Sequence, residues 1–319
     1  MMRCMVTGAA GFLGSHLCDA ALEREWHVIG VDNLFRGRSE NIPEHANFEF
    51  EALDLTTDIE GLVRLIESSQ PDIILHYGAI NGTEYFYDRP WKVLDTNVGA
   101  TIGLLRAIEQ SGHKPQRVAY ASSSEVYGEI PDRIPTDELA LMRLDIHSIR
   151  DSYAAAKAIG DFYVRMFCED NKIDWTILRI FNAYGPRMDS SKFGQVVPEF
   201  IARALSDESF TIIGDGMQTR SFCHVDDHVR MVLDLVVHEQ GAGVFNIGND
   251  EETTMLKLAS TIHEVLDLPF EVEHLPPRPH DPLRRVPDCS KTWALTGSCQ
   301  VDLRTGLTMT AEWYRDRLA

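Results

Sequence analysis

The chain has 319 residues, of which 44% are hydrophobic and 25% are charged, as is typical of a soluble globular protein with one large or two modest domains. Its net charge of −19 argues against nonspecific binding to nucleic acid or to an anionic membrane. Six scattered cysteines without a C-x-x-C pair indicate neither a disulfide framework nor a zinc site, and we predict no metal.

The N-terminal segment runs directly into a predicted strand at 3–7, and the chain contains no apolar run of membrane-spanning length. Because neither a signal peptide nor a membrane span is indicated, we expect a cytoplasmic protein.

A glycine-rich turn joins this strand to a predicted helix at 12–25. Gly8, Gly11 and Gly14 have the spacing at which a backbone can turn tightly, approach a diphosphate and pack a helix on a strand. The N–H groups at the helix N-terminus then favour negative charge. Three glycines can also mark ordinary tight turns, but this context predicts a site for a dinucleotide diphosphate.

The next predicted strand, at 28–32, ends on Asp32, about 20 residues beyond the glycines. A dinucleotide-binding fold places there the carboxylate that binds the ribose hydroxyls. Asp32 favours NAD over NADP, because a carboxylate would repel a 2′-phosphate. We interpret Arg36 and Arg38 as solvated loop charges.

Strand and helix patterns alternate as far as residue 181. Further strands are predicted near 48–50, 73–76, 117–121 and 176–181, and further helices near 58–69, 91–112 and 152–171. This alternation predicts an α/β Rossmann fold, a doubly wound parallel sheet with helices on both faces. Shorter elements rich in Pro, Gly and Arg then predict a smaller C-terminal substrate-binding lobe. We predict an NAD-binding domain at 1–181, to which 226–246 returns, and the lobe at 182–319.

Tyr153 and Lys157 lie one turn apart on the same face of the helix predicted at 152–171. A free tyrosine has a pKa of about 10, and an adjacent ammonium favours its phenolate. An isolated pair of this kind is most often a surface feature. Here, however, the strand at 117–121 ends in the serine-rich loop 122–124, at the edge where parallel sheets bind ligands. A serine hydroxyl there can share a substrate proton with Tyr153, although turn and N-cap chemistry is the alternative.

Together these segments resemble the extended short-chain dehydrogenase/reductase superfamily, in the branch that acts on nucleotide-diphosphate sugars. The matching motifs run in order along nearly the whole chain: T-G-A-A-G-F-L-G at 7–14, D-N-L at 32–34, D-L at 54–55, S-S-S-E-V-Y-G at 122–128, Y-x-x-x-K at 153–157, R-I-F-N-A-Y-G-P at 179–186, G-D-G at 214–216 through V-D-D at 225–227, and R-P-H-D at 278–281 through R-V-P-D at 285–288.

The resemblance implies which residues bind ligands. NAD would contact Gly8, Gly11, Phe12, Leu13, Gly14, Asp32, Asn33, Asp54, Leu55, Tyr153 and Lys157. A nucleotide-diphosphate sugar, most often a UDP-sugar, would be held by Asn182, Val197, Arg220 and Arg278, with Asp281 near its ribose and with Ser124 and Tyr85 near the sugar. Arginines suit this role because an acidic protein must supply cationic donors locally. The aromatic segment 82–87 departs from the family pattern, and its rings either stack on the sugar or fill the core.

The resemblance also implies the chemistry. Tyr153 would remove the proton of the sugar C4 hydroxyl while NAD takes the C4 hydride, Ser123 would relay the proton, and Lys157 would lower the pKa of Tyr153. The fate of the resulting ketone defines the enzyme. Return of the hydride to the other face inverts C4, a C6 carboxylate can leave as CO2, and loss of water from C6 is dehydration.

Dehydration is disfavoured, because Ser123-Ser124-Glu125 stands where the 4,6-dehydratases have T-D-E. Glu125 stands where both decarboxylases and dehydratases have a glutamate, although an ordinary loop carboxylate is the alternative. Against a decarboxylase, Lys157 is followed by Ala158 and not by the arginine common in one decarboxylase group. We predict a nucleotide-sugar 4-epimerase with retained NAD, with a UDP-glucuronate decarboxylase as the alternative. A non-catalytic NAD-binding protein is disfavoured because both Tyr153 and Lys157 are present.

The predicted helices at 91–112 and 152–171 carry apolar residues on more than one face. These residues are Ile102, Leu105, Ile108, Ile159, Phe162, Val164 and Met166. One face must cover the sheet, and the other could pair with a second subunit in a four-helix bundle, the dimer mode common in the resembled family. We therefore expect a homodimer.

Overall fold

The computed structural model describes residues 1–191, 195–206, 210–276 and 284–318. Its central element is a seven-stranded, entirely parallel sheet in the order β11-β6-β5-β4-β1-β2-β3. The strands are β1 (Arg3–Thr7), β2 (His27–Asp32), β3 (Phe48–Ala52), β4 (Ile73–His76), β5 (Arg117–Ser123), β6 (Asp174–Ile180) and β11 (Gly243–Ile247). The predicted Rossmann architecture is confirmed.

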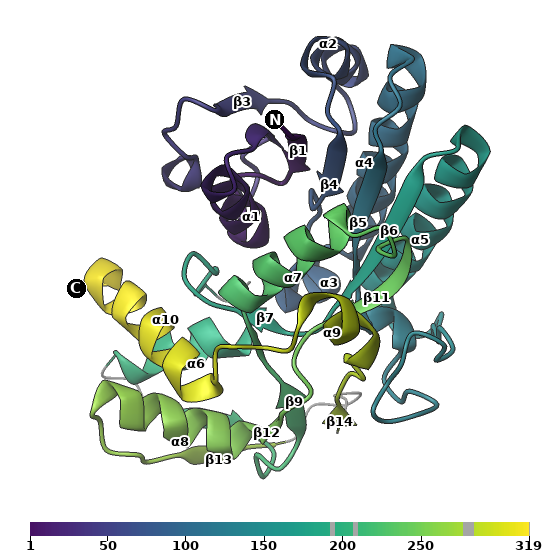
Figure 1. The fold of residues 1–319 in the computed structure, drawn as a ribbon. Coiled ribbons are helices and arrows are strands. Elements are labelled where there is room, and N and C mark those ends of the chain that lie inside the picture. The colour runs from purple at the N-terminus through teal and green to yellow at the C-terminus, as the bar shows by residue number, and fades with distance from the viewer. Residues whose placement is uncertain (192–194, 207–209, 277–283, 319) are drawn as a thin grey trace.

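Helices cover both faces of this sheet (Figure 1). One face carries α1 (Phe12–Glu23), α7 (Val225–Val237) and α9 (Ser290–Thr296), and the other carries α2 (Ile59–Ser69), α4 (Pro90–Ser111) and α5 (Asp151–Asn171). Successive side chains of a strand point to opposite faces, so Val6 joins the core under α1 and α7 while Met5 joins the core under α2 and α4. The sheet is therefore buried between two apolar layers.

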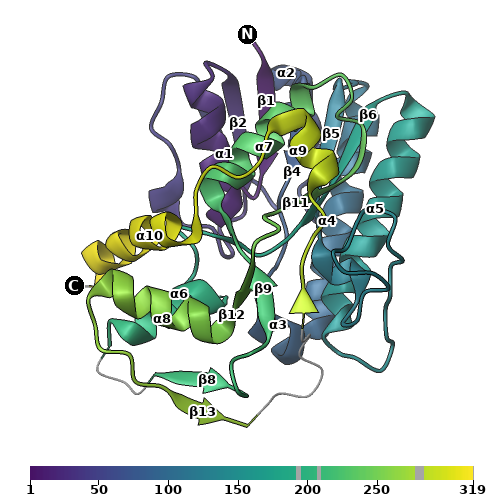
Figure 2. The ribbon, with the colours of Figure 1, turned by 60° about the horizontal axis from the view of Figure 1, so that its bottom comes forward.

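A smaller lobe lies below the carboxyl edge of the sheet (Figure 2). Its core is enclosed by α6 (Val196–Ala204), α8 (Met255–Leu266) and α10 (Leu303–Leu318). Short strands complete it and connect it to the sheet: β7 (Ala183–Tyr184), β8 (Thr211–Ile213), β9 (Thr219–Ser221), β10 (Cys223–His224), β12 (Glu252–Thr254), β13 (Glu273–Leu275) and β14 (Arg284–Arg285). The chain leaves this lobe through α7 and β11, and β11 pairs with β6 inside the large sheet.

The long helices α4 and α5 lie side by side on one flank of the molecule (Figure 1). Leu105 and Val164 are buried against the sheet, whereas Ile159, Phe162 and Met166 on α5 are 38%, 50% and 58% exposed. The outer face of α5 is thus apolar and open to solvent. In the described ranges, no helix combines the length and the apolar character needed to cross a bilayer.

Candidate active site

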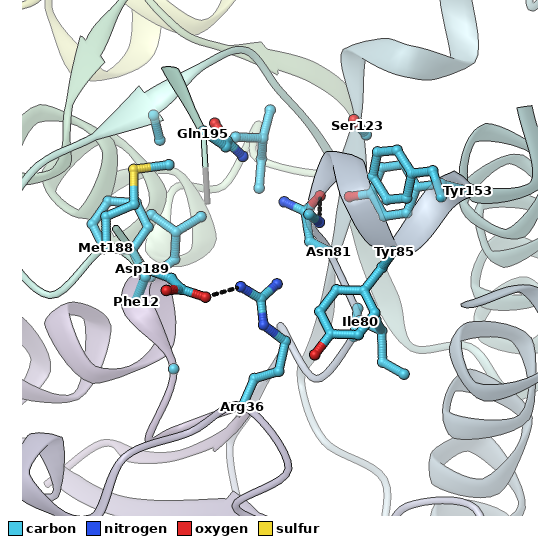
Figure 3. A pocket seen from close by; sticks show the side chains of 18 of the residues that line it. Phe12, Arg36, Ile80, Asn81, Tyr85, Ser123, Tyr153, Met188, Asp189 and Gln195 are labelled. Atoms are coloured by element: carbon cyan, nitrogen blue, oxygen red, sulfur yellow. Dashed lines mark hydrogen bonds and ion pairs between the residues drawn. The ribbon is translucent and has the colours of Figure 1, made fainter. Parts of the chain in front are cut away.

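A cavity of about 870 Å³ opens at the carboxyl edge of the sheet, between the sheet and the smaller lobe. Parallel strands end together at this edge, so loops that are distant in sequence meet there. Most of the predicted site residues line the cavity: Gly8, Gly11, Phe12, Leu13, Gly14, Asp32, Asn33, Asp54, Leu55, Tyr85, Ser123, Ser124, Glu125, Tyr153, Lys157, Asn182 and Arg220. Figure 3 shows Phe12, Tyr85, Ser123 and Tyr153 around its interior.

One of the predicted residues that the structure describes is not brought to this cavity. Val197 is 2% exposed and packs into the core of the smaller lobe, while its neighbour Val196 lines the cavity. The reason is that successive side chains on α6 point about 100° apart, so only one of the two can face the opening. Arg278 and Asp281 lie outside the described residues. Among the side chains that are described, no group of three His, Cys, Asp or Glu is arranged to hold a metal ion.

The glycine turn between β1 and α1 is too close to its neighbours to carry side chains. Gly8 has a φ of +73°, and a Cβ at Gly14 would lie 2.0 Å from the Gly8 carbonyl oxygen. Helix α1 begins at Phe12, and its N-cap residue, Gly11, offers no side chain to the first-turn N–H groups. These N–H groups face the cavity and suit a bound diphosphate. The turn therefore fits NAD.

Asp32 ends β2 beside this turn. Its Oδ2 accepts a hydrogen bond from the backbone N–H of Ala10 at 3.1 Å, and its Oδ1 accepts one from Leu34 at 2.8 Å. Burial raises the pKa of Asp32, and these hydrogen bonds oppose the rise. Asn33, the next residue, donates a hydrogen bond at 2.7 Å to Asp54, which follows the neighbouring strand β3. The carboxylate that the sequence predicts for the NAD ribose is thus held at the lip of the cavity by backbone.

Helix α5 places Tyr153 and Lys157 in the cavity wall, where both are more than nine-tenths buried. Ser123, at the end of β5, forms a hydrogen bond with the Tyr153 hydroxyl. The Lys157 ammonium donates to the carbonyl oxygen of Ala121 at 2.7 Å and lies 5.7 Å from the centroid of the Tyr153 ring. Ser123 and Tyr153 are therefore placed to exchange a proton, whereas Lys157 can act on the tyrosine through its charge.

The pKa of Tyr153 differs from the sequence-based expectation. Burial and the negative charge of Glu125 raise this pKa above its usual range, and the hydrogen bond with Ser123 lowers it only in part. Burial also lowers the pKa of Lys157 to about 8, against the opposing charge of Asp161. In the protein alone desolvation therefore sets the direction of the shift. The expectation that Lys157 lowers the pKa of Tyr153 stays a prediction for the enzyme with NAD bound.

Glu125 lies in the short 3-10 helix η2 (Ser124–Tyr127), between two arginines from distant segments. Arg285 donates to it at 2.5 Å and Arg150 at 3.1 Å. Burial would raise the pKa of Glu125, but the two guanidinium groups lower it to about 2. The side chain is therefore a fixed carboxylate at neutral pH, and the cluster of Glu125, Arg150 and Arg285 carries a net positive charge. We call it the Glu–Arg cluster.

The aromatic segment after β4 forms α3 (Thr83–Asp88), and its rings have different roles. Phe86 is 4% exposed and stacks on the ring of Tyr153, with centroids 4.6 Å apart and an interplanar angle of 19°. Tyr85 lines the cavity, and the Arg36 guanidinium lies 5.2 Å from its ring centroid. Both rings thus line the cavity, and Phe86 also packs against the candidate base.

Several residues of the site had no clear sequence signal. Arg150 and Arg285 are missing from the predicted set, although Arg285 lies in a quoted motif and Arg150 lies one turn before Tyr153. The interpretation of Arg36 as a solvated charge is wrong, because its side chain is 24% exposed and pairs with Asp189 at 2.8 Å. The side chain of Arg38 is 59% exposed, and its guanidinium lies 3.5 Å from the Glu40 carboxylate. It is a solvated loop charge, as the sequence predicts.

The chain is similar to proteins of known family and structure. A model of the NAD dependent epimerase/dehydratase family matches residues 4–248. UDP-glucuronic acid decarboxylase 4 of Arabidopsis thaliana is 36% identical over 100% of this chain and 70% of its own length. The structure of UDP-glucose 4-epimerase from Thermotoga maritima has a TM-score of 0.90 at 31% identity, with both chains fully covered. UDP-glucuronic acid 4-epimerase from Bacillus cereus, solved with UDP-glucuronic acid and NAD, has a TM-score of 0.87 at 29% identity and covers 99% of this chain and 100% of its own.

Proposed function

The chain belongs to the NAD-dependent epimerase/dehydratase family, and from this premise we propose that it decarboxylates a UDP-linked uronic acid through a 4-keto intermediate. The observation that carries this proposal is the Glu–Arg cluster, which brings two guanidinium groups and one fixed carboxylate to the cavity wall that also holds Tyr153. Relatives named UDP-glucuronic acid decarboxylase that span the whole chain support it.

The first step is oxidation at C4. NAD supplies the hydride acceptor and later the hydride donor. Tyr153 takes the proton of the C4 hydroxyl, with Ser123 in hydrogen-bond contact as the relay. Phe86 holds the tyrosine ring in one orientation by stacking on it. The pKa of Tyr153 is raised in the protein alone, so formation of its phenolate requires positive charge nearby. The Lys157 ammonium beside the ring supplies part of that charge.

The second step uses the Glu–Arg cluster. A 4-keto uronic acid is a β-keto acid, so cleavage of the C5–C6 bond releases CO2 and leaves the electron pair as an enolate across C5, C4 and the C4 oxygen. Arg150 and Arg285 attract the C6 carboxylate of the substrate and stabilise the enolate charge. Glu125 limits how tightly the substrate carboxylate can pair with them, because two carboxylates then compete for the same guanidinium groups. The enolate takes a proton from solvent at C5, the hydride returns to C4, and Tyr153 returns its proton to the C4 oxygen.

The same cluster weighs against inversion at C4. An epimerase must let the 4-keto sugar turn within the site before the hydride returns, and a carboxylate bound to fixed arginines opposes that rotation. The 4-epimerase favoured by the motifs remains the second candidate, because structures with TM-scores of 0.90 and 0.87 are UDP-glucose and UDP-glucuronic acid 4-epimerases.

Incubation with UDP-glucuronic acid tests the proposal. We expect a product lighter by one CO2 by mass spectrometry, at a rate that exceeds any conversion of UDP-glucose. Nuclear magnetic resonance of the sugar protons measures inversion at C4 in the same samples. Conversion of either sugar to its C4 epimer without loss of mass would reject decarboxylation and support the second candidate.

We further propose a homodimer formed through the exposed apolar face of α5. Burial of Phe162 and Met166 against a second copy would remove large apolar side chains from water. Light scattering should then give twice the chain mass of 36.0 kDa at micromolar concentration. The variant Phe162→Glu should shift the protein toward the single-chain mass. A single-chain mass for the unmodified protein would contradict the proposal.

A further inference from the structure

An ion pair crosses the cavity from one wall to the other. Arg36 extends from the loop after β2, on the Rossmann side, and its guanidinium contacts the carboxylate of Asp189 at 2.8 Å. Asp189 belongs to the segment after β7, at the edge of the smaller lobe. In Figure 3 the dashed line between them runs across the open space between Phe12 and Tyr85. The pair therefore spans the cleft beside the turn that fits the NAD diphosphate.

The backbone around Arg36 is ordered by hydrogen bonds to its own loop. Leu34 has a φ of +57°, a left-handed conformation that its N–H bond to Asp32 stabilises. The N–H of Phe35 bonds to the side chain of Asn33, and the N–H of Arg38 bonds to the carbonyl oxygen of Ala10. The carboxylate expected to bind the NAD ribose thus lies in the same bonded loop as the arginine.

The segment that carries Asp189 is anchored to the Rossmann side as well. Arg187, with a φ of +66°, pairs with Asp19 of α1 at 2.7 Å, and His16 of α1 bonds to the carbonyl oxygen of Pro186 at 3.0 Å. The N–H of Ser191 bonds to Asp189 Oδ1 at 2.9 Å. Because both partners are already positioned, little conformational entropy is lost when they meet.

The environment of the pair strengthens it beyond an ordinary surface contact. The side chains of Arg36 and Asp189 are 24% and 29% exposed. Partial burial would raise the pKa of Asp189, but hydrogen bonds from Ser191 and the charge of Arg36 hold it below its usual value. The guanidinium also lies over Tyr85, which adds a cation–π contact from α3. Three separate segments therefore meet across the opening.

We propose that Arg36 and Asp189 form a strap across the cleft that keeps NAD bound between its reduction and its reoxidation. In both proposed reactions the hydride taken from the substrate is returned to it, so loss of the cofactor as NADH would leave the sugar as the 4-ketone. Exit of the dinucleotide past Arg36 requires the pair to open. This inference rests on NAD as cofactor and not on whether the ketone loses CO2 or is inverted.

The rate of cofactor release tests the strap without any sugar. NADH fluorescence is followed after the loaded protein is mixed with excess NAD. We expect release about five- to tenfold faster in Arg36→Met and in Asp189→Asn, and no faster in the double variant than in the faster single one, because each change removes the same contact. The swap of Arg36→Asp with Asp189→Arg should restore slow release.

A matched ion pair outside the cavity serves as control. Arg24 and Asp234 join α1 to α7 at 2.7 Å with exposures of 31% and 35%, and neither residue lines the cavity. Arg24→Met should leave NADH release unchanged. Unchanged release in both Arg36→Met and Asp189→Asn, or effects that add in the double variant, would overturn the strap. If a single variant loses stability, the swap of Arg36→Asp with Asp189→Arg decides, since only re-formation of the pair can restore slow release.

Discussion

Replacing Tyr153 with phenylalanine is expected to lower turnover by about 10²- to 10⁴-fold while NAD binding and the melting temperature stay unchanged. The substitution keeps the ring that stacks on Phe86 and removes only the hydroxyl that bonds to Ser123. Steady-state kinetics, NADH titration and thermal unfolding measure the three quantities. Because the missing group acts in proton transfer, the loss should fall on kcat and not on KM.

The control for this variant is Tyr163→Phe. Tyr163 lies on the same helix, is 45% exposed and does not line the cavity, so its substitution should leave kcat unchanged.

The pH profile adds a second check. The pKa of Tyr153 lies above its usual range in the protein alone, and that of Lys157 is about 8. Activity should rise from acidic pH as Tyr153 becomes a better base, and Tyr153→Phe should abolish that rise. If Tyr153→Phe keeps a near-normal kcat, Tyr153 is not the base of the reaction.

The substitution Glu125→Gln is expected to lower kcat for CO2 release by about 100-fold or more without raising KM for the uronic acid. It removes a carboxylate that pairs with both Arg150 and Arg285, so the substrate carboxylate can pair with them more tightly before it leaves. Tighter binding of the substrate carboxylate before the reaction raises the barrier to its departure as CO2. With a pKa of about 2 in the folded protein, Glu125 stays ionised throughout the neutral range, so the effect should not vary between pH 6 and pH 9.

Glu138→Gln is the matched control. Glu138 is partly buried and accepts a hydrogen bond from the backbone of Asn246 at 2.9 Å, but it does not line the cavity. Its substitution should affect stability without changing kcat. If Glu125→Gln keeps full turnover, the Glu–Arg cluster has no part in the chemistry, and inversion at C4 becomes the better account of the enzyme.

The sequence alone was sufficient for the parts of the site that are built within one short segment. The glycine turn needs only β1, the turn and α1 in succession, and Asp32 ends the next strand. Tyr153 and Lys157 share a face because residues four apart on a helix always do. The alternation of strands and helices up to residue 181 was enough for the parallel sheet, since parallel strands require such crossovers. Local periodicity decides these features whatever the rest of the chain does.

The tertiary structure decided which charges meet. Glu125 is 25 residues from Arg150 and 160 from Arg285, and Arg36 is 153 residues from Asp189. A sequence with 49 acidic and 30 basic residues offers each of them many partners. The choice among these depends on which loops the sheet edge brings together.

Burial was also decided by the tertiary structure. Stacking of Phe86 on Tyr153 and the nearby charge of Glu125 set the environment of the candidate base, and neither follows from the spacing of Tyr153 and Lys157. The sequence by itself favours a 4-epimerase because it does not show that two arginines surround Glu125. A pKa depends on the water and charge around a group in space, so only the packed structure determines whether a glutamate is a loop carboxylate or part of a charged cluster.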